Sequence, residues 1–447
     1  MTTNGNHAPP GPKGLPILGL ALDVRNDALG TLQRLARQYG DIVSMPVLQM
    51  NRILLNRPDY IQQLLILDHA KLHKSTLTKL VIGPLLGQGL LISEGDFWRR
   101  QRRLAQPAFH RSRTNEYSPV MVDCTLERMK HWQAGETRNI AEEMMKLTLE
   151  VAVRTLFGTS LPGDSESIGK AMTFLMRYYL RRGRSPWRVP ASWPTPANRR
   201  ARREVEYMDS LIYGIISDRK KDTQPRNDLL SLLMAAMNED GSRMSERQVR
   251  DESMTLFVAG HETTALSLSW TWYLLSENPE AESRLHAELR SVLGGQPAEV
   301  SDLEKLPYLN AVIHESLRLY PPAFIMARMN VEPVSVGGYE IPPRSTLLAS
   351  QWVMHRDARY YEQPERFMPE RWLNGLEQRL PPGAYFPFGD GPRRCIGQGF
   401  AQLETALVVA AIAQEFSFRL KKGFPVIPEP LVTLRPKYGI EMTITAR

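Results

Sequence analysis

Cysteine is nearly absent from this chain. Cys124 and Cys395 are the only two cysteines in 447 residues, and they lie far apart in the sequence. Two cysteines cannot build the disulfide framework of a small secreted protein or a cysteine-rich zinc site. The pattern is typical of an intracellular protein in a reducing compartment, so we expect a cytoplasmic location.

Long apolar runs are also missing from the beginning of the chain. The most apolar early run, Leu15–Leu22, contains Pro16 and Gly19. It is far shorter than the roughly 20 apolar residues of a membrane helix. The opening segment MTTNGNHAPP lacks the basic start of a secretory signal. We therefore expect no transmembrane segment and a flexible, proline-rich leader over residues 1–30.

The sequence has no internal repeat, no low-complexity block and no recognisable nucleic-acid module. Its formal net charge is +8, in an ordinary globular mixture of 42% hydrophobic and 23% charged residues. A basic balance permits an acidic partner, but it is also typical of a solvated surface. We expect no binding to nucleic acid.

Helical patterns dominate what is present. Residues 41–57 alternate in the manner of a hairpin, and residues 98–319 are mostly helical in pattern. A long helix is predicted over 244–278, with a capping box at Ser245 and Gln248 and a stop at Asn278-Pro279. Further helices are predicted over 308–319 and 397–415. The arginine-rich segment 177–203 is predicted to be mobile. The fold class is mainly α with a small β-region.

The segment FPFGDGPRRCIGQGFA surrounds Cys395 with glycines that allow tight turns. A helix is predicted to begin just after this cysteine, and its positive dipole end favours the thiolate form. Such a thiolate suits nucleophilic catalysis or metal ligation. The alternative is a buried structural cysteine, which is the commonest fate of a lone one.

A second polar segment, AGHETT at 259–264, lies in the middle of the long helix. A zinc-protease helix would need a second histidine at position 265, where this chain has alanine, so zinc is rejected. Glu262 beside two threonines inside an apolar helix is costly and requires a reason. The alternative is a polar cluster that is satisfied by its own neighbours.

The pattern Phe388-Gly389-x-Gly391-x-Arg393-x-Cys395-x-Gly397 resembles the haem-binding signature of the cytochrome P-450 family. The resemblance implies that Cys395 is the axial thiolate ligand of the iron of haem b. Phe388 would pack on the sulfur side, and Arg393 would pair with a haem propionate. A thiolate ligand favours O–O bond cleavage. The resemblance implies the P-450 fold, a triangular α-rich prism with a long central oxygen-binding helix, as a single domain over 31–447.

The same resemblance assigns roles on the long helix. Gly260 would leave room for O2, and Glu262 and Thr263 match an acid–alcohol pair that delivers protons. Trp98, Arg102 and Arg328 match positions that contact haem propionates.

Two further groups follow from the resemblance. A structural triad behind the haem is implied for Glu315, Arg318 and Arg371, with Arg366 as the competitor for the third place. An apolar substrate pocket is implied for Val258, Ala259, Phe324, Ile325, Val432 and Thr433, with further walls from the loop around residues 77–91 and from residues 173–179.

The function implied is that of a soluble monooxygenase of bacterial type, a monomer that inserts one oxygen atom of O2 into an apolar molecule such as a fatty acid, terpenoid or steroid. No reductase domain is recognisable, so electrons would come from a ferredoxin or flavodoxin with its reductase. Two alternatives remain open. One is a peroxide-driven peroxygenase of the same fold, against which the Glu262-Thr263 pair counts. The other is a non-catalytic haem sensor or electron-transfer protein.

Overall fold

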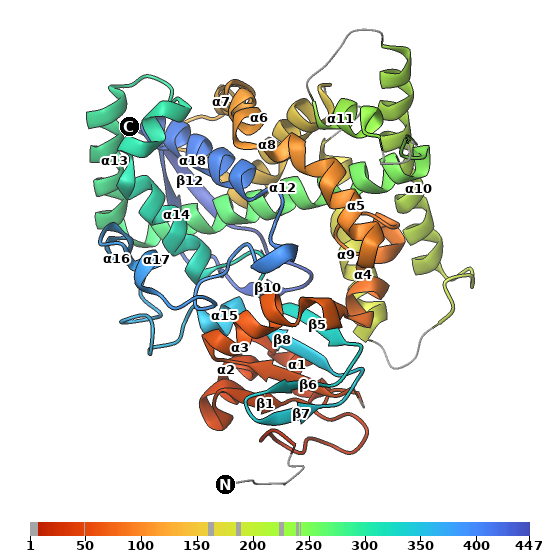
Figure 1. Ribbon diagram of the computed structural model, residues 1–447. Helices are drawn as coiled ribbons and strands as arrows, with labels where there is room; N and C mark the ends of the chain where they lie inside the picture. The colour runs from red at the N-terminus through yellow and green to blue at the C-terminus, as the bar shows by residue number, and fades with distance from the viewer. Residues whose placement is uncertain are drawn as a thin grey trace. The chain divides into compact units, whose positions relative to one another are not determined.

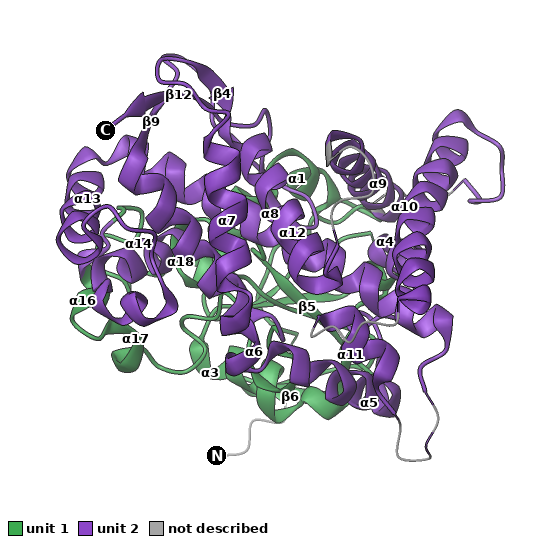
Figure 2. Ribbon diagram, turned by 90° about the horizontal axis from the view of Figure 1, so that it is seen from above, with its two compact units in different colours: residues 1–79, 317–367, 371–395 green, residues 80–316, 368–370, 396–447 purple. Residues whose placement is uncertain are grey.

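The computed structural model describes residues 8–48, 50–159, 165–184, 189–222, 228–237, 241 and 243–447 (Figure 1). The described chain is mostly helical with small β-sheets, which confirms the predicted fold class. It divides into two compact units, unit 1 (1–79, 317–367 and 371–395) and unit 2 (80–316, 368–370 and 396–447), coloured separately in Figure 2. The single domain over 31–447 stays a prediction beside this division.

Unit 1 is built on a mixed sheet with the strand order β1-β2-β8-β5-β3. Its strands are β1 (Ile42–Ser44), β2 (Arg52–Leu55), β3 (Leu72–Lys74), β5 (Met326–Asn330) and β8 (Thr346–Ala349). The hairpin predicted over 41–57 is confirmed, because β1 pairs antiparallel with β2. β2 pairs in parallel with β8, and the other neighbours are antiparallel. A separate hairpin joins β6 (Val334–Val336) and β7 (Tyr339–Ile341).

The core of unit 1 collects one face of this sheet and the short helices around it. Ile53 and Leu55 alternate along β2 toward the same buried cluster as Ile61, Leu347 and Phe386. The helices of this unit are α1 (Ala21–Asn26), α2 (Ala28–Tyr39), α3 (Pro58–Gln62), α15 (Gln351–Met354), α17 (Leu376–Arg379) and the single turns η1 (Gln63–Leu67), η2 (His69–Lys71) and η5 (Gly391–Arg393).

Unit 2 is helical around α12 (Glu246–Glu277). The predicted capping box is present: the N–H of Gln248 donates to the Ser245 hydroxyl, and the Ser245 N–H donates to the Gln248 side chain. The helix ends at Asn278, and Pro279 begins the next one. Almost every residue of α12 from Val249 to Leu275 is buried, so it forms the core of unit 2.

The other helices of unit 2 are α5 (Gly95–Ala105), η3 (Gln106–Phe109), α6 (Arg111–Glu116), α7 (Ser118–Met129), α8 (Ile140–Phe157), α9 (Ser165–Arg184), α10 (Pro196–Lys221), α11 (Leu229–Ala235), α13 (Pro279–Leu293), η4 (Val300–Lys305) and α18 (Gln398–Glu415). Three helices have residues in both units: α4 (Thr76–Leu86), α14 (Pro307–Leu319) and α16 (Glu370–Leu373). The sheets of unit 2 are β4 (Thr137–Asn139), β12 (Glu441–Ala446) and β9 (Phe416–Leu420) in that order, and the hairpin of β10 (Pro428–Pro430) with β11 (Leu434–Pro436).

Several predictions concern the edges of the described chain. The predicted leader over 1–30 contains α1 and the start of α2, and its residues 1–7 lie outside the described residues. The predicted mobile segment 177–203 covers the end of α9 and the start of α10, and its residues 185–188 also lie outside them. Within the described ranges, no helix combines the length and apolar character needed to cross a membrane.

Candidate active site

Cys395 lies in unit 1 on an exposed loop, and neither cysteine forms a disulfide. Its backbone N–H donates to the carbonyl of Phe388 at 3.0 Å. Gly389 and Gly391 have φ angles of +72° and +66°, in the left-handed region that favours glycine. A Cβ at position 391 would lie 2.3 Å from the carbonyl oxygen of Leu65. Two of the glycines predicted to turn the chain around the sulfur, Gly389 and Gly391, are therefore required by the backbone, whereas Gly397 has a φ angle of −90° and is not.

A buried histidine holds the start of this loop. The N–H of Phe386 donates to His355 Nε2 at 3.0 Å. Burial, followed by the nearby guanidinium groups of Arg318 and Arg356, holds the pKa of His355 well below its usual value. His355 is therefore neutral and able to accept this bond. The sequence prediction gave it no chemistry, and the structure makes it a positioning residue for the cysteine loop.

The other predicted haem contacts of unit 1 come from two elements. Arg393 ends the turn η5 and is half-buried, while Arg328 is buried on β5 with Nη1 3.1 Å from the carbonyl of Ala327. Of the two predicted pocket residues here, Phe324 is buried and Ile325 is half-buried. Whether these four contact a cofactor or substrate stays a prediction.

The set of possible metal ligands is informative. Among the described residues, no group of three or more His, Cys, Asp or Glu side chains could hold a bare metal ion. A metal at Cys395 would then have at most two ligands of these types among the described residues and would have to bring its others with it. A porphyrin supplies its own four nitrogen ligands, so the residues present fit haem iron.

The segment AGHETT forms the middle of α12 in unit 2. The Thr263 hydroxyl donates to the carbonyl of Ala259 at 2.9 Å, and the Thr264 hydroxyl donates to that of Gly260 at 3.1 Å. Thr263 is half-buried and keeps lone pairs that can accept a further hydrogen bond. A Cβ at Gly260 would lie 3.6 Å from Leu156, which is ordinary contact, so packing against α8 does not require glycine.

Glu262 is fully engaged in an ion pair. Its Oε1 atom lies 2.7 Å from Arg435 Nη2 and 2.9 Å from Arg435 Nε, and it also accepts from the Thr433 hydroxyl. Burial alone would raise the pKa of Glu262, but Arg435 and Thr433 bring that pKa below its usual value. The predicted proton carrier is therefore held as a carboxylate. Arg435 was not predicted as a site residue.

On the same segment, the side chain of Thr264 lies beside a second buried glutamate, Glu404 of α18. Burial raises the pKa of Glu404 well above its usual value, against the smaller effect of Thr264. Its Oε1 atom has no hydrogen-bond partner among the described residues. Glu404 was also missed by the sequence prediction, although a single acid in the apolar run of α18 is a detectable signal.

Two carboxylates near the start of α12 hold the loop between α4 and α5. The N–H of Gln88 donates to Asp251 at 2.8 Å, and the N–H of Leu90 donates to Glu252 at 2.9 Å. Burial raises the pKa of Glu252 to about 7, although the N–H of Leu90 opposes this. This loop belongs to the region from which a pocket wall is expected, so α12 determines its position.

The helix α5 presents the predicted Trp98 and Arg102 on one face, four residues apart. Trp98 is buried and Arg102 is half-buried, while Arg99, Arg100 and Arg103 are exposed. Arg99 pairs with Asp96 at 2.7 Å. The division of α5 into a buried face and a basic solvent face is thus observed, and contact with haem propionates stays a prediction.

The remaining predicted pocket residues of unit 2 come from α12 and from the segment before β11. Val258 is buried, and Ala259 and Val432 are half-buried. Thr433 is buried with its hydroxyl on Glu262, so it ties its segment to α12. A role in lining a substrate pocket stays a prediction for all four.

The three residues of the predicted triad contact the backbone around 362–368. Buried Glu315 accepts from the N–H of Met368 at 2.9 Å. Arg318 Nη1 donates to the carbonyl of Pro364 at 2.6 Å, and Arg371 Nη1 donates to that of Glu362 at 2.9 Å. These contacts suit a folding role, and the grouping as a triad stays a prediction.

Comparison with known proteins gives a consistent result. The family model described as Cytochrome P450 matches residues 9–443. Cyclooctatin synthase of Streptomyces melanosporofaciens is 37% identical, over 95% of this chain and 92% of its own. Cyclooctat-9-en-7-ol 5-monooxygenase of the same organism is 34% identical, over 92% and 90%. Pentalenene oxygenase of Streptomyces avermitilis is 30% identical, over 98% and 97%.

Proposed function

Because the chain belongs to the cytochrome P450 family, whose members are haem monooxygenases that use O2 and redox partners, we propose that it oxygenates an apolar terpenoid. The three Streptomyces relatives are named for cyclooctatin, cyclooctat-9-en-7-ol and pentalenene, which supports this substrate class. Electrons would come from a ferredoxin or flavodoxin. We also propose that the protein is a monomer located in the cytoplasm.

The cofactor that fits is haem b. Covalent haem attachment uses two nearby cysteines, and Cys124 is buried in α7, far along the chain from Cys395. Cys395 would ligate the iron, and Arg393, Arg328, Trp98 and Arg102 would bind the propionates. When bound, this haem supplies the activation of O2 for insertion into a C–H bond.

The observation that carries the proposal is the exposed Cys395 on its glycine-turned loop. In Cys395→Ala, the reduced protein should lose the CO spectrum of thiolate-ligated haem, together with product formation from a terpene and a reductase system. Cys124→Ala is the matched control and should keep both. A Cys395→Ala protein with an unchanged spectrum would refute the ligand assignment. A wild-type protein with the thiolate spectrum but no oxygenated product from any terpene would favour a haem sensor.

Proton delivery is assigned to Thr263, whose hydroxyl is anchored at Ala259 and can still accept a hydrogen bond. Glu262 is held as an anion by Arg435, so it could take up a proton only when that ion pair loosens. General acid–base assistance contributes about 10²–10⁴-fold.

Thr263→Ala should therefore keep substrate affinity and divert reducing equivalents from product to peroxide. Thr271→Ala loses a similar bond to the carbonyl four residues before it and should couple normally. Equal coupling in the wild type and Thr263→Ala would overturn this role.

An acidic electron carrier is supported by the exposed arginines of α5. Rim charges change the association rate and its salt dependence more than affinity, and screening acts over about 8 Å at physiological ionic strength. Arg99→Glu/Arg103→Glu should slow reduction by an acidic ferredoxin at low salt and flatten the salt dependence. Arg202→Glu/Arg203→Glu, on the exposed side of α10, carries the same charge change. The ferredoxin should reduce this variant at the wild-type rate. Equal rates and salt slopes in all three proteins would refute the docking role.

A further inference from the structure

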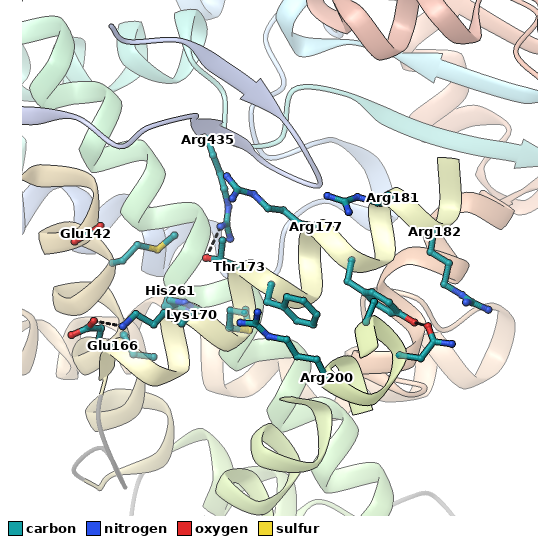
Figure 3. Close-up of a pocket in the computed structure, with 18 of the residues that line it drawn as sticks. Glu142, Glu166, Lys170, Thr173, Arg177, Arg181, Arg182, Arg200, His261 and Arg435 are labelled. Carbon is teal, nitrogen blue, oxygen red and sulfur yellow. Dashed lines mark hydrogen bonds and ion pairs between the residues drawn. The ribbon is translucent and has the colours of Figure 1, made fainter. Parts of the chain in front are cut away.

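Unit 2 contains a cavity of about 790 Å³ between α8, α9 and the start of α10 (Figure 3). Its wall includes residues of the expected pocket segment 173–179, but none of Val258, Ala259, Phe324, Ile325, Val432 and Thr433. The cavity has room for a ligand of small-molecule size.

The described wall of this cavity is strongly basic. It has seven lysine and arginine side chains against two acidic ones, Glu142 and Glu166. Glu166 is already paired with Lys170. An excess of like charge around one space costs free energy through repulsion, and a bound anion would remove that cost.

Some of these lysine and arginine side chains are already paired with carboxylates of the protein, and others could bind a ligand. Arg177 pairs with Glu429 at 3.0 Å, and Arg435 pairs with Glu262 at 2.7 Å. Arg200 lies over the ring of Phe174, 4.1 Å from its centre, and reaches Glu204 at 3.3 Å. Arg181 is exposed and has no carboxylate partner among the described residues. Figure 3 shows Arg177 and Arg181 along α9 and Arg200 across from them.

The rest of the wall combines apolar and aromatic side chains with the polar Thr173, Thr195, Asn198 and His261. Met145 and Leu149 contribute from α8, and Met172, Phe174 and Tyr178 contribute from α9. Tyr178 is fixed by its hydroxyl, which donates to the Asn198 side chain at 2.6 Å. Apolar and aromatic side chains in the same wall as several guanidinium groups suit a ligand with an apolar chain and a charged head.

We propose that this cavity binds an amphipathic anion, a carboxylate or phosphate group carried on an apolar chain. The head group binds at Arg181 and Arg200, and the chain lies against the methionines and aromatic rings. Arg435 Nη1 is 3.0 Å from the Thr173 hydroxyl in the same wall, so this site adjoins the residue that holds Glu262. The proposal does not depend on which terpenoid is the substrate.

The test is calorimetric titration of the haem-loaded protein with dodecyl phosphate below its micelle concentration. Dodecanoate presents the other head group, dodecanol has the chain without a charge, and inorganic phosphate has the charge without a chain. Dodecyl phosphate, dodecanoate or both should bind at least tenfold more tightly than either control molecule. Haem absorption is followed in parallel, because a ligand at the haem displaces its water and shifts the spectrum, whereas a ligand in this cavity leaves it unchanged.

Arg181→Glu/Arg200→Glu should weaken the binding at least tenfold, which corresponds to about 1.4 kcal/mol. Arg181→Gln alone should weaken it less and guards against misfolding of the double variant. Arg202→Glu/Arg203→Glu changes the same charge on α10 outside the cavity wall and should bind as the wild type does. Binding that follows the haem spectrum, equal binding of dodecanol, or equal loss in both double variants would overturn the proposal.

Discussion

Two buried glutamates lie at the segment AGHETT, Glu262 within it and Glu404 beside Thr264, and their pKa values are shifted in opposite directions. Glu262 has a pKa below its usual value, whereas the pKa of Glu404 is well above it. Both side chains are inaccessible to solvent to nearly the same degree, with 3% and 1% of each residue exposed. Burial therefore does not decide whether an acid is charged.

The charge state of each buried acid depends on the side chains that contact its carboxyl group. Glu262 has the guanidinium group of Arg435 and the hydroxyl of Thr433, while Glu404 has only the side chain of Thr264. Glu252 is an intermediate case, with a backbone N–H as its partner and a pKa of about 7. One helix, α12, thus carries a charged acid at residue 262 and lies beside a neutral acid at residue 264.

The largest loss of stability is expected for Arg435→Met, which removes the cation that keeps Glu262 charged. Removing one member of a buried ion pair leaves an uncompensated charge and costs about 3–5 kcal/mol. Urea unfolding at pH 8 should show this loss, and the loss should shrink at pH 5 because the unpaired Glu262 can then take up a proton. Glu262→Gln/Arg435→Met should recover most of the stability. An unchanged single variant would show that the ion pair does not hold Glu262.

The second prediction concerns Glu252. A folded-state pKa raised from 4.5 to about 7 contributes stability that is present below pH 4.5 and is lost as the pH rises through 7. The Glu252→Gln variant has no such group to ionise. Its free energy of unfolding relative to that of the wild type should therefore rise by about 3 kcal/mol between pH 4.5 and pH 7. The measurement is urea unfolding as a function of pH. Exposed Glu280→Gln is the control and should follow the wild-type curve.

Thr433→Val should have a smaller effect. It removes the hydroxyl that donates to Glu262 while keeping the side-chain shape, and a hydrogen bond to a charged group contributes about 2 kcal/mol. Thr405→Val removes a buried hydroxyl that donates to a neutral carbonyl, that of Ala401, and should cost less. Chemical denaturation of both variants at pH 7 tests this. Equal losses would mean that the charge on Glu262 adds nothing.

The last prediction concerns Glu404→Gln. Because wild-type Glu404 is neutral in the folded state, its amide replacement keeps the same charge there. The wild type loses stability as the pH rises above the ordinary range of a carboxyl group, and the variant does not. Relative stability should therefore rise between pH 5 and pH 8 by about 1.4 kcal/mol for each pH unit over which Glu404 stays protonated in the folded state. A flat difference between those pH values would place a charged Glu404 in the core.

Local signals explain what the sequence predicted well. The capping box at Ser245 and the stop at Asn278-Pro279 determine the ends of α12 within one or two residues. The glycine spacing around Cys395 predicted a turned loop, and the positive φ angles of Gly389 and Gly391 agree. In each case the residues that set the conformation are close together in the chain.

The partners of the acids could not be predicted in the same way. Arg435 is 173 positions from Glu262, and its own surroundings, VTLRPKYG, contain no sign of a buried charge. The sequence prediction named Glu262 as a proton carrier without its counter-ion, so it could not tell that the group is held as an anion. Only the tertiary fold brings the segment before and within β11 to α12.

The parallel pairing of β2 with β8 has a consequence for how the chain is made. Arg52 pairs with Thr346, and Asn51 bonds to Ser345 across 294 positions. At synthesis rates of about 5–20 residues per second, β2 waits roughly 15–60 s on the ribosome before its partner emerges. During that time the helices of unit 2 can form from local contacts, while the first hairpin has an unpaired edge. The nascent N-terminal strands are therefore the segment of this protein most in need of a chaperone.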